Sequence, residues 1–168
     1  MRIFLIGFMG AGKTTIGRKL SEDLNLKFID LDKYIENKIG MTITFIFNKM
    51  GEKKFRLIEK ECLIELSKEE NVIIATGGGT PCFYNNMQKI LDCGISIYLK
   101  TEIEYLLKRL EKDKNGRPLI QNKSISEIET YLKNQLPKRD NFYKQADYTL
   151  DAKDISVEII RKKIFQDR

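Results

Sequence analysis

Short apolar runs alternate along the chain with stripes of apolar residues at helical spacing. The runs predict five strands, at 2–6, 26–32, 71–79, 95–99 and 148–150. The stripes, such as Ile16, Leu20 and Leu24, repeat at helical intervals and predict amphipathic helices between the strands. Strands that alternate with helices are typical of βαβ units. The pattern therefore predicts an α/β fold with three layers, a parallel sheet between helices, and leaves the strand order open.

Local signals mark the ends of several predicted helices. Gly51 is expected to end one helix before a long amphipathic helix over 52–70. Thr101 and Glu104 have the spacing of a capping box for the helix that follows the fourth strand. Pro137 interrupts a helical stretch, where it predicts either a break or the first turn of a new helix.

Length and composition favour one globular domain. The 168 residues fit a single domain over 1–168, and 42% of them are apolar with no low-complexity linker. The apolar runs are too short and too often broken by glycine to span a bilayer. The N-terminus enters a strand without the layout of a signal peptide. We therefore expect a cytoplasmic protein with no membrane partner.

The charged residues point to small anionic partners. The chain has 30 Lys and Arg against 24 Asp and Glu, a net charge of +6, which favours anions. The lysines are scattered and no RNA-binding motif with interleaved aromatic residues is present, so we expect no nucleic acid partner. The chain has no histidine, which excludes a histidine base or nucleophile. Its three irregularly spaced cysteines do not make a zinc site.

The stretch "GFMGAGKT", from Gly7 to Thr14, joins the first strand to the first helix. It matches G-x-x-x-x-G-K-[ST], in which glycines with positive φ bring backbone N–H groups against phosphate oxygens. Lys13 is then placed to reach the β- and γ-phosphates, and the Thr14 hydroxyl to bind magnesium. A plain glycine-rich turn would give no reason for Lys-Thr at its end. The sequence therefore predicts a nucleoside triphosphate site with magnesium.

Proteins that bind a nucleoside triphosphate in this way include GTPase switches, motor ATPases and kinases. A GTPase would carry "NKxD", but none of the three NK dipeptides is followed by x-Asp. A motor ATPase would need an apolar strand that ends in Asp or Glu, whereas the strand over 71–79 ends in glycines. The small size and a further set of placed charges favour a small-molecule kinase.

Asp30 and Asp32 form the first part of that set. The alternation of side chains along a strand would put both carboxylates on the same side of a strand end, at the edge where ligands bind α/β sheets. Two neighbouring carboxylates favour a cation or polyol hydroxyls between them. The alternative is that they only cap the following helix.

Arg56 and a glycine triplet form the second part. Arg56 lies in the apolar stripe of its helix and needs a partner, which is either Glu59 in a structural ion pair or a ligand carboxylate held by two hydrogen bonds. The triplet Gly77, Gly78 and Gly79 follows the third strand. Bare N–H groups without side-chain bulk are suited to close contact with a substrate.

Six stretches together resemble the shikimate kinase family: "GFMGAGKTTIGRKL", "FIDLDKYIE", "IFNKMGEKKFRLIE", "ATGGGTP", "RPLI" and "KRDNFY". The resemblance extends from the first strand to about Asp147. It implies a P-loop fold like that of nucleoside monophosphate kinases, with five parallel strands in the order 2-3-1-4-5. It also implies ATP-dependent phosphorylation of the 3-hydroxyl of shikimate, a step of chorismate and aromatic amino-acid biosynthesis. The implied partners are ATP with Mg²⁺ and shikimate. We expect the protein to be a monomer.

The same resemblance implies a role for each site residue. For the nucleotide it implies contacts from Gly10, Ala11, Gly12, Lys13, Thr14, Thr15, Arg109 and Arg117, with magnesium bound by Thr14 and, through water, by Asp30. For shikimate it implies Asp32, Arg56, Gly77, Gly78, Gly79 and Arg139, within a substrate-binding region at about 31–60 and beyond it. The two arginines 56 and 139 would clamp the carboxylate. Lys13, Asp32 and Arg117 would be catalytic, with Asp32 as the candidate base.

The lid, at about 111–124, departs from the family pattern at one point. Many relatives have an arginine seven residues before the "RPL" motif that stacks on adenine, but this chain has Leu110 there, so Arg109 becomes the candidate. Residues 108–123 carry six Lys and Arg against two Asp and Glu, a net charge of +4. A cationic flap over the phosphates would exclude water and favour transfer over hydrolysis.

Three other functions are compatible with part of this sequence pattern. A kinase of another polyol acid, such as gluconate, would keep the phosphate loop but not the Phe-Arg and triple-glycine pair. A nucleoside monophosphate kinase would need more clustered arginines around its phosphate acceptor. A regulator that binds the nucleotide without catalysis would not need the complete catalytic set.

Overall fold

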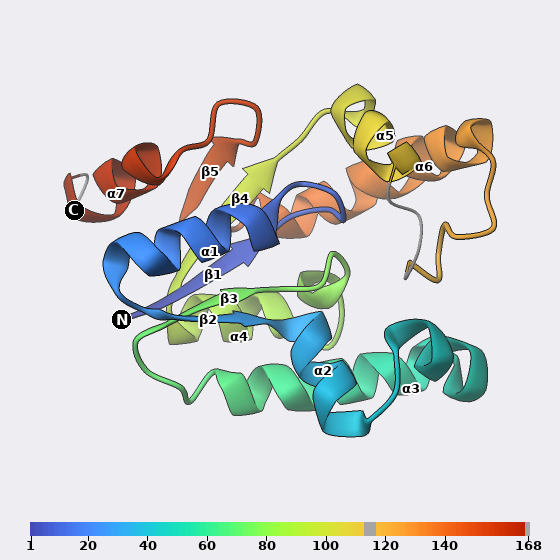
Figure 1. Cartoon of the computed structure of the whole chain (residues 1–168), viewed down its shortest axis with the longest axis horizontal. Coiled ribbons are helices and arrows are strands. Elements are labelled where there is room, and N and C mark those ends of the chain that lie inside the picture. Colours follow the sequence, from blue (N-terminus) through green and yellow to red (C-terminus); the bar gives the residue numbers. More distant parts are fainter. Residues whose placement is uncertain (113–116, 167–168) are drawn as a thin grey trace.

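Five parallel strands form one sheet in the order β2-β3-β1-β4-β5 (Figure 1). The strands are β1 (Arg2–Ile6), β2 (Lys27–Asp30), β3 (Val72–Ala75), β4 (Ile95–Lys100) and β5 (Tyr148–Asp151). This computed structural model describes residues 1–112 and 117–166. The predicted α/β class and the strand order that the resemblance implied are both confirmed.

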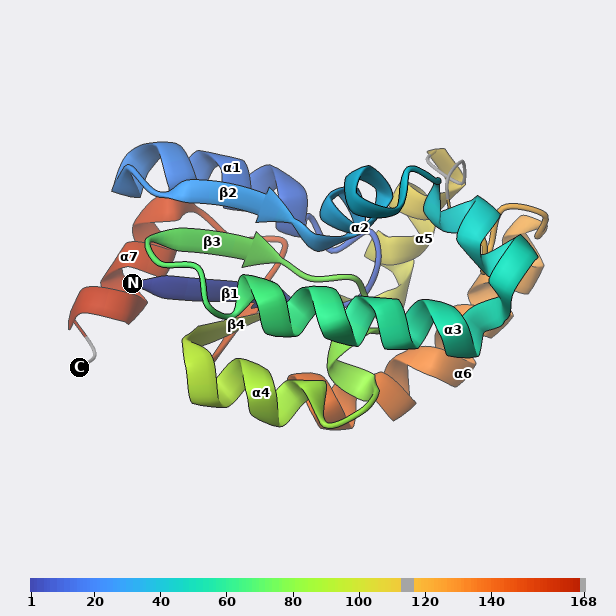
Figure 2. The ribbon, with the colours of Figure 1, turned by 90° about the horizontal axis from the view of Figure 1, so that it is seen from below.

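Helices cover both faces of the sheet and make the three layers. The helices are α1 (Lys13–Leu24), α2 (Leu31–Ile39), α3 (Ile43–Leu66), α4 (Asn86–Cys93), α5 (Ile103–Lys112), α6 (Ile125–Tyr143) and α7 (Val157–Gln166), with a short 3₁₀ helix, η1 (Thr80–Cys82). Figure 2 shows α1 on one side of the strands and α4 on the other. Alternate residues of β1 therefore enter different cores.

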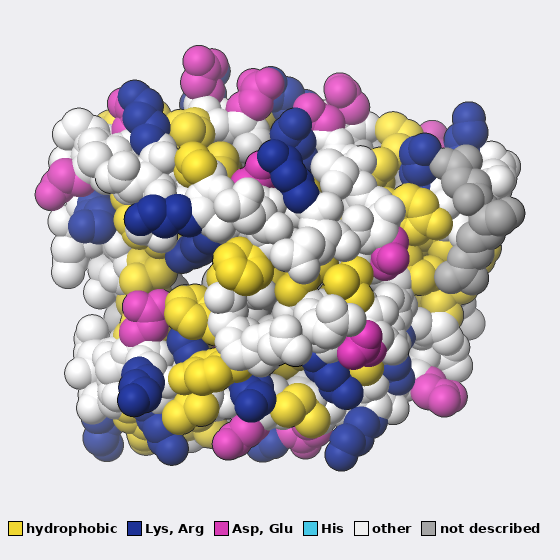
Figure 3. All heavy atoms as spheres, turned by 180° about the vertical axis from the view of Figure 1, so that it is seen from behind, with side chains coloured by type: hydrophobic (Ala, Val, Ile, Leu, Met, Phe, Trp, Pro, Cys, Tyr) yellow, Lys and Arg dark blue, Asp and Glu magenta, His cyan; other side chains and the backbone are white. Residues whose placement is uncertain are grey.

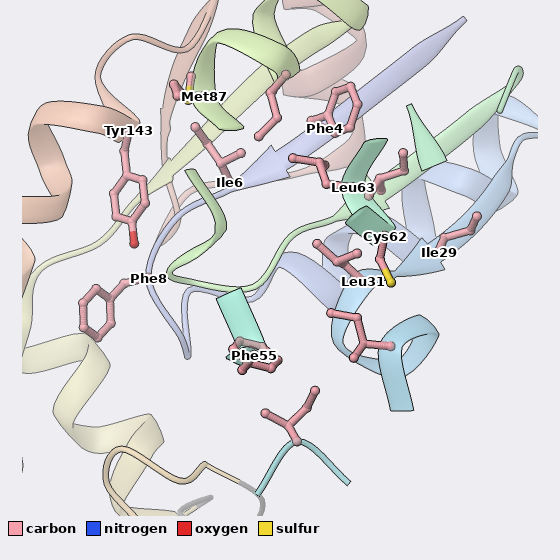
Figure 4. Close-up of a cluster of buried hydrophobic side chains, with 14 of the residues drawn as sticks. Phe4, Ile6, Phe8, Ile29, Leu31, Phe55, Cys62, Leu63, Met87 and Tyr143 are labelled. Atoms are coloured by element: carbon pink, nitrogen blue, oxygen red, sulfur yellow. The ribbon is translucent and has the colours of Figure 1, made fainter. Parts of the chain in front are cut away.

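One core lies beneath α1 and α7. It contains Ile3 and Leu5 of β1 packed with Leu20 and Ile160 of the two helices. The other core is larger, and it is built by Phe4 and Ile6 together with side chains of α3, α4 and α6. Figure 4 shows part of this second core, which extends from Leu63 on α3 to Tyr143 on α6. Burial of both faces explains why the inner strands β1 and β3 are nearly continuous apolar runs.

The functional edge of the sheet is set by the connections after β1 and β3. The chain leaves β1 toward α1 on one face and leaves β3 toward η1 and α4 on the other. Where neighbouring strands send their connections to opposite faces, a crevice opens at the carboxyl ends of the strands. The phosphate loop and the glycine triplet lie at this point.

The predicted break at Gly51 is confirmed. The helical segment α3 spans it, but Gly51 itself has φ 78° and ψ 163°, which is not helical. The first part of α3 therefore runs in a different direction from the second part, which carries Phe55 and Arg56.

Three local predictions were wrong. The second strand ends at Asp30, and Asp32 lies in the first turn of α2, so the two carboxylates are not alternate residues of one strand. The Thr101 hydroxyl donates to the carbonyl of Leu99, 3.1 Å away, and α5 begins only at Ile103, so Thr101 makes no capping box. Pro137 lies inside α6, which continues through it to Tyr143.

The surface carries mixed charges. On the face drawn in Figure 3, Lys and Arg side chains are interspersed with Asp and Glu. Within the described part of the chain, no helix is both long and apolar enough to cross a membrane.

Candidate active site

A cavity of about 450 Å³ lies at the carboxyl edge of the sheet. Its walls come from the phosphate loop, α2, α3, the loop after β3, α5, the segment at 117–119 and α6. Segments that are distant in sequence therefore contribute to one site.

The phosphate loop has the backbone that its glycines predict. Gly7, Gly10 and Gly12 have φ values of 137°, 86° and 94°, a region that other residues rarely adopt. Gly12 is the residue that precedes α1, and no side chain caps the N–H groups of this helix. A helix N-terminus with free N–H groups and a positive dipole end is a site for an anion.

Lys13 is buried at the start of α1 and is directed at the loop. Its Nζ donates to the carbonyl oxygens of Gly7 and Phe8, at 2.8 and 2.9 Å. Burial lowers the pKa of Lys13 to about 8, which the nearby Asp32 and Asp30 partly oppose. A lysine held this close to the loop is placed to move onto a phosphate.

The side-chain oxygens of Thr14 and Asp30 lie next to each other beside the phosphate loop. The Thr14 hydroxyl donates to Oδ2 of Asp30 at 2.7 Å, and Oδ1 of Asp30 accepts the N–H of Lys33 at 3.3 Å. Asp30 therefore caps α2, as the alternative interpretation proposed, and also faces the phosphate loop. A hydroxyl and a carboxylate beside an anion site fit Mg²⁺, which takes few protein ligands and fills the rest with phosphate oxygens and water.

Asp32 and Glu59 place a second pair of carboxylates deeper in the cavity. Glu59 is fully buried, and its Oε1 accepts the hydroxyl of Thr80 at 2.6 Å. Burial raises the pKa of Asp32 to about 7, and the charges of Glu59 and Asp30 add to this effect. A carboxyl group with a pKa near neutrality is suited to accept a proton from a hydroxyl.

Arg56 is held between two glutamates and three aromatic rings. It is 4% exposed, and its Nη1 donates to Oε2 of Glu59 at 2.9 Å. Nε and Nη2 donate to Oε1 of Glu52, at 3.2 and 3.0 Å. The guanidinium also lies 4.4 Å from the ring centre of Phe83. The ion pair with Glu59 that the sequence left as an alternative is therefore present.

Each glycine of the triplet is in close contact with a different part of the site. A Cβ at Gly77 would lie 2.8 Å from Oε1 of Glu59 and 2.9 Å from Oδ1 of Asp32, and one at Gly78 would lie 2.9 Å from the backbone nitrogen of Met9. A Cβ at Gly79 would lie 2.6 Å from the guanidinium nitrogens of Arg56. A side chain at Gly78 would collide with backbone, whereas one at Gly77 or Gly79 would displace the charged side chains of the site.

Three further arginines border the cavity. The guanidinium of Arg139, on α6, lies 4.8 Å from the ring centre of Phe8 and donates to the hydroxyl of Tyr131 at 3.2 Å. Arg117 is close enough to Lys13 to lower its pKa. Nη1 of Arg109 donates to the Tyr105 hydroxyl at 3.1 Å and lies next to Gly12.

Comparison with known proteins identifies the family to which the chain belongs. The model of the shikimate kinase family matches residues 9–167. A shikimate kinase of Azobacteroides pseudotrichonymphae is 51% identical over 160 residues, which cover 95% of this chain and 94% of the relative. The chain belongs to the shikimate kinase family. The prediction of a shikimate kinase enzyme is thereby confirmed.

Two solved shikimate kinases have the same architecture. The crystal structure from Bacteroides thetaiotaomicron has a TM-score of 0.92 and 39% identity, and it covers 98% of each chain. The enzyme from Acinetobacter baumannii in complex with shikimate also has a TM-score of 0.92 and 39% identity, over 99% of this chain and 94% of the other. Members of the family generally depend on MgATP.

The cavity brings together almost every residue that the sequence singled out. Its walls include Gly10, Gly12, Lys13, Thr14, Thr15, Asp30, Asp32, Arg56, Gly77, Gly78, Gly79, Arg109, Arg117 and Arg139. Ala11 is not among them, since it packs into the core beneath α1. Leu110 is fully buried, which leaves Arg109 as the residue at the cavity.

Sequence reasoning missed several residues of the site. Phe47, Thr76 and Leu119 line the cavity without having been predicted to do so, and Glu59 was considered only as a partner of Arg56. A signal for Glu59 was present, because it occupies the buried stripe of α3 three residues after Arg56. A charged residue in a buried stripe requires a partner and marks a polar site.

Proposed function

We propose that this chain transfers the γ-phosphoryl group of ATP to the 3-hydroxyl of shikimate and releases ADP and shikimate 3-phosphate. One observation carries the proposal: a single cavity has an anion-binding loop at one end and two buried arginines beside a glycine loop at the other. Phosphates fit the first end and a small hydroxylated carboxylic acid fits the second.

At the nucleotide end, the loop N–H groups and Lys13 are proposed to hold the β- and γ-phosphates. The ammonium of Lys13 would exchange the carbonyls of Gly7 and Phe8 for phosphate oxygens, which are stronger acceptors. Thr14 and, through water, Asp30 would hold Mg²⁺, which would neutralise charge on the phosphates. Arg109 is our candidate for the contact with adenine, because its guanidinium borders the loop beside Gly12.

At the acceptor end, Arg56 and Arg139 are proposed to bind the shikimate carboxylate. Arg56 already holds a carboxylate, that of Glu52, with two nitrogens. The Glu52 side chain is 46% exposed, whereas Glu59, on the other side of the guanidinium, is fully buried. We expect the substrate carboxylate to displace Glu52 and Glu59 to remain as the fixed partner.

The chemical step requires alignment, charge compensation and transfer of one proton. The 3-hydroxyl oxygen bonds to the γ-phosphorus while the bond from the γ-phosphorus to the β–γ bridging oxygen breaks, and ADP leaves with that electron pair. Asp32 is proposed to orient the hydroxyl and to accept its proton, which then passes to solvent. A pKa of about 7 for Asp32 suits this role.

The lid is proposed to complete the site. Arg117 borders the cavity near Lys13, where a second cation would stabilise the transferring phosphoryl group. Pro118 and Leu119 border the same cavity and would help to exclude water. Part of the predicted lid, residues 113–116, lies outside the described residues.

Further predictions concern the whole chain. We propose one domain over 1–168 that acts as a monomer, because a single chain supplies both ends of the cavity. A cytoplasmic location also stays a prediction.

The proposal is tested by ADP release from purified protein with no acceptor, with shikimate, with gluconate and with AMP. We expect rapid release only with shikimate and MgATP. Turnover with gluconate or AMP but not with shikimate would contradict the proposal, and ATP binding without turnover on any acceptor would favour the regulator instead.

A further inference from the structure

Tyr143 is a fully buried tyrosine at the C-terminal end of α6, and it lies behind the glycine triplet that lines the cavity. The hydroxyl donates to the backbone carbonyl of Gly78, in the glycine triplet. Figure 4 shows the side chain projecting from α6 with its oxygen directed toward the loop after β3. A buried polar group of this kind joins two segments that are distant in sequence.

The peptide that Tyr143 holds is the peptide that faces the site. A trans peptide is planar, so the N–H of Gly79 points away from the C=O of Gly78. Fixing this carbonyl on one side therefore fixes the direction of the Gly79 N–H on the other. Gly78 and Gly79 both line the cavity, and Gly79 lies against the guanidinium of Arg56.

The Tyr143 side chain also lies close to Arg139, the second arginine of the acceptor end. Arg139 precedes Tyr143 by one helical turn on α6, and its charge acts on the Tyr143 hydroxyl. Burial raises the pKa of Tyr143, so the phenol stays a neutral donor at physiological pH. Tyr143 therefore contacts the carbonyl of Gly78 and lies close to Arg139, while the next residue, Gly79, packs against Arg56.

We infer that Tyr143 is a positioning residue for the acceptor, whose hydroxyl orients the Gly78–Gly79 peptide and aligns it with Arg56 and Arg139. The inference rests on the proposed function, since it assigns these groups to the binding of shikimate. Tyr143 does not touch the reacting atoms, so its removal acts through the placement of the acceptor.

The chain contains a close match for a control. Tyr98, on β4, is also buried, and its ring lies 5.1 Å from that of Tyr143. Its hydroxyl donates to Oδ1 of Asp140 at 2.8 Å, and Asp140 keeps a second partner in Lys144. Tyr98→Phe therefore removes one buried hydroxyl from the same cluster without releasing the glycine peptide.

The test compares steady-state kinetics and thermal unfolding of wild type, Tyr143→Phe and Tyr98→Phe. We expect both variants to lose similar stability. Only Tyr143→Phe should raise the KM for shikimate, by about 3- to 10-fold, because one buried hydrogen bond is lost. Its KM for ATP should change less than about twofold, since the phosphate loop is held by its own glycines and by Lys13.

Three results of this comparison would contradict the positioning role of Tyr143. An unchanged shikimate KM in Tyr143→Phe, equal shifts in both variants, or a Tyr143→Phe protein that does not fold would overturn the inference and leave the hydroxyl a structural role. The proposed function fails separately, if the wild type itself does not use shikimate.

Discussion

The two ends of the cavity are built in different ways. At the nucleotide end, the anion site comes from one short segment, 7–15, in which backbone conformation and a helix N-terminus create it. The acceptor end comes from α2, α3, the loop after β3 and α6, and it depends on contacts between side chains. Backbone geometry is specified locally, whereas a network of buried charges requires the whole fold.

The two ends are nevertheless in direct contact. Phe8 belongs to the phosphate loop, and its ring lies beneath the guanidinium of Arg139. Gly78 packs against the backbone of Met9 in the same loop. This contact holds the two ends in a fixed register for transfer. Because different segments supply the two ends, we still expect a substitution at one end to affect mainly one substrate.

The largest effect is expected at the nucleotide end. Lys13→Met should lower kcat by about 10³-fold or more, because a cation on the transferring phosphoryl group is lost. ADP release with saturating shikimate measures the effect. Lys19→Met, an exposed substitution on the same helix, is the control and should keep wild-type kcat. Equal activity of the two variants would refute the nucleotide site.

Substitutions of the two aspartates should differ in how kcat responds to the magnesium concentration. Asp32→Asn should lower kcat by about 10²-fold or more at all magnesium concentrations, since the proton acceptor is lost. The defect of Asp30→Asn should decrease as magnesium is raised, because its role is to support the metal. A magnesium series for both variants decides this point. Identical responses would remove the distinction between the two carboxylates.

Arg56→Lys tests the acceptor end alone. We expect kcat/KM for shikimate to fall by about 10- to 100-fold, because an ammonium cannot replace the two-nitrogen contact of a guanidinium. The KM for ATP should stay near that of the wild type. Arg161→Lys, on α7 outside the cavity, is the matched control. A variant that loses ATP affinity instead would show that the two ends are not separable.

The smallest expected effect is an improvement in shikimate binding rather than a loss. Glu52→Gln removes the carboxylate that competes with the substrate for Arg56, so the KM for shikimate should decrease by about two- to fivefold, the scale of an exposed ion pair. Glu129→Gln breaks a comparable pair with Lys133 on α6 and should leave this KM unchanged. A higher KM in Glu52→Gln would mean that Glu52 holds Arg56 in place for the substrate.

The difference between the two ends also explains what the sequence could predict. The phosphate loop was predictable residue by residue, because glycine spacing, the lysine and the hydroxyl report a local backbone. The strand order came from the family resemblance, since apolar runs do not record which strands pair. Asp32 was placed on the wrong element, because two residues after Asp30 the chain has already begun a helix capped by Asp30 itself.

Long-range polar contacts were beyond the reach of the sequence. The contact of Tyr143 with Gly78 joins positions that only the folded chain brings together. The capping box expected at Thr101 is absent, because the Thr101 hydroxyl bonds to the carbonyl of Leu99 on β4. A capping box is present at the start of α6, formed by Ser124 and Glu127. Pro137 is tolerated inside α6 although its ring removes one N–H from the helix.

The function proposed for this chain depends on buried arginines at one end of the cavity that bind the acceptor through its carboxylate. The most direct measurement compares wild-type kcat/KM for shikimate with that for an analogue whose carboxylate is reduced to an alcohol. We expect kcat/KM to be about 10²-fold or more lower with the analogue, since charged hydrogen bonds to two guanidinium groups are removed. Equal kcat/KM for the two compounds would contradict this binding mode.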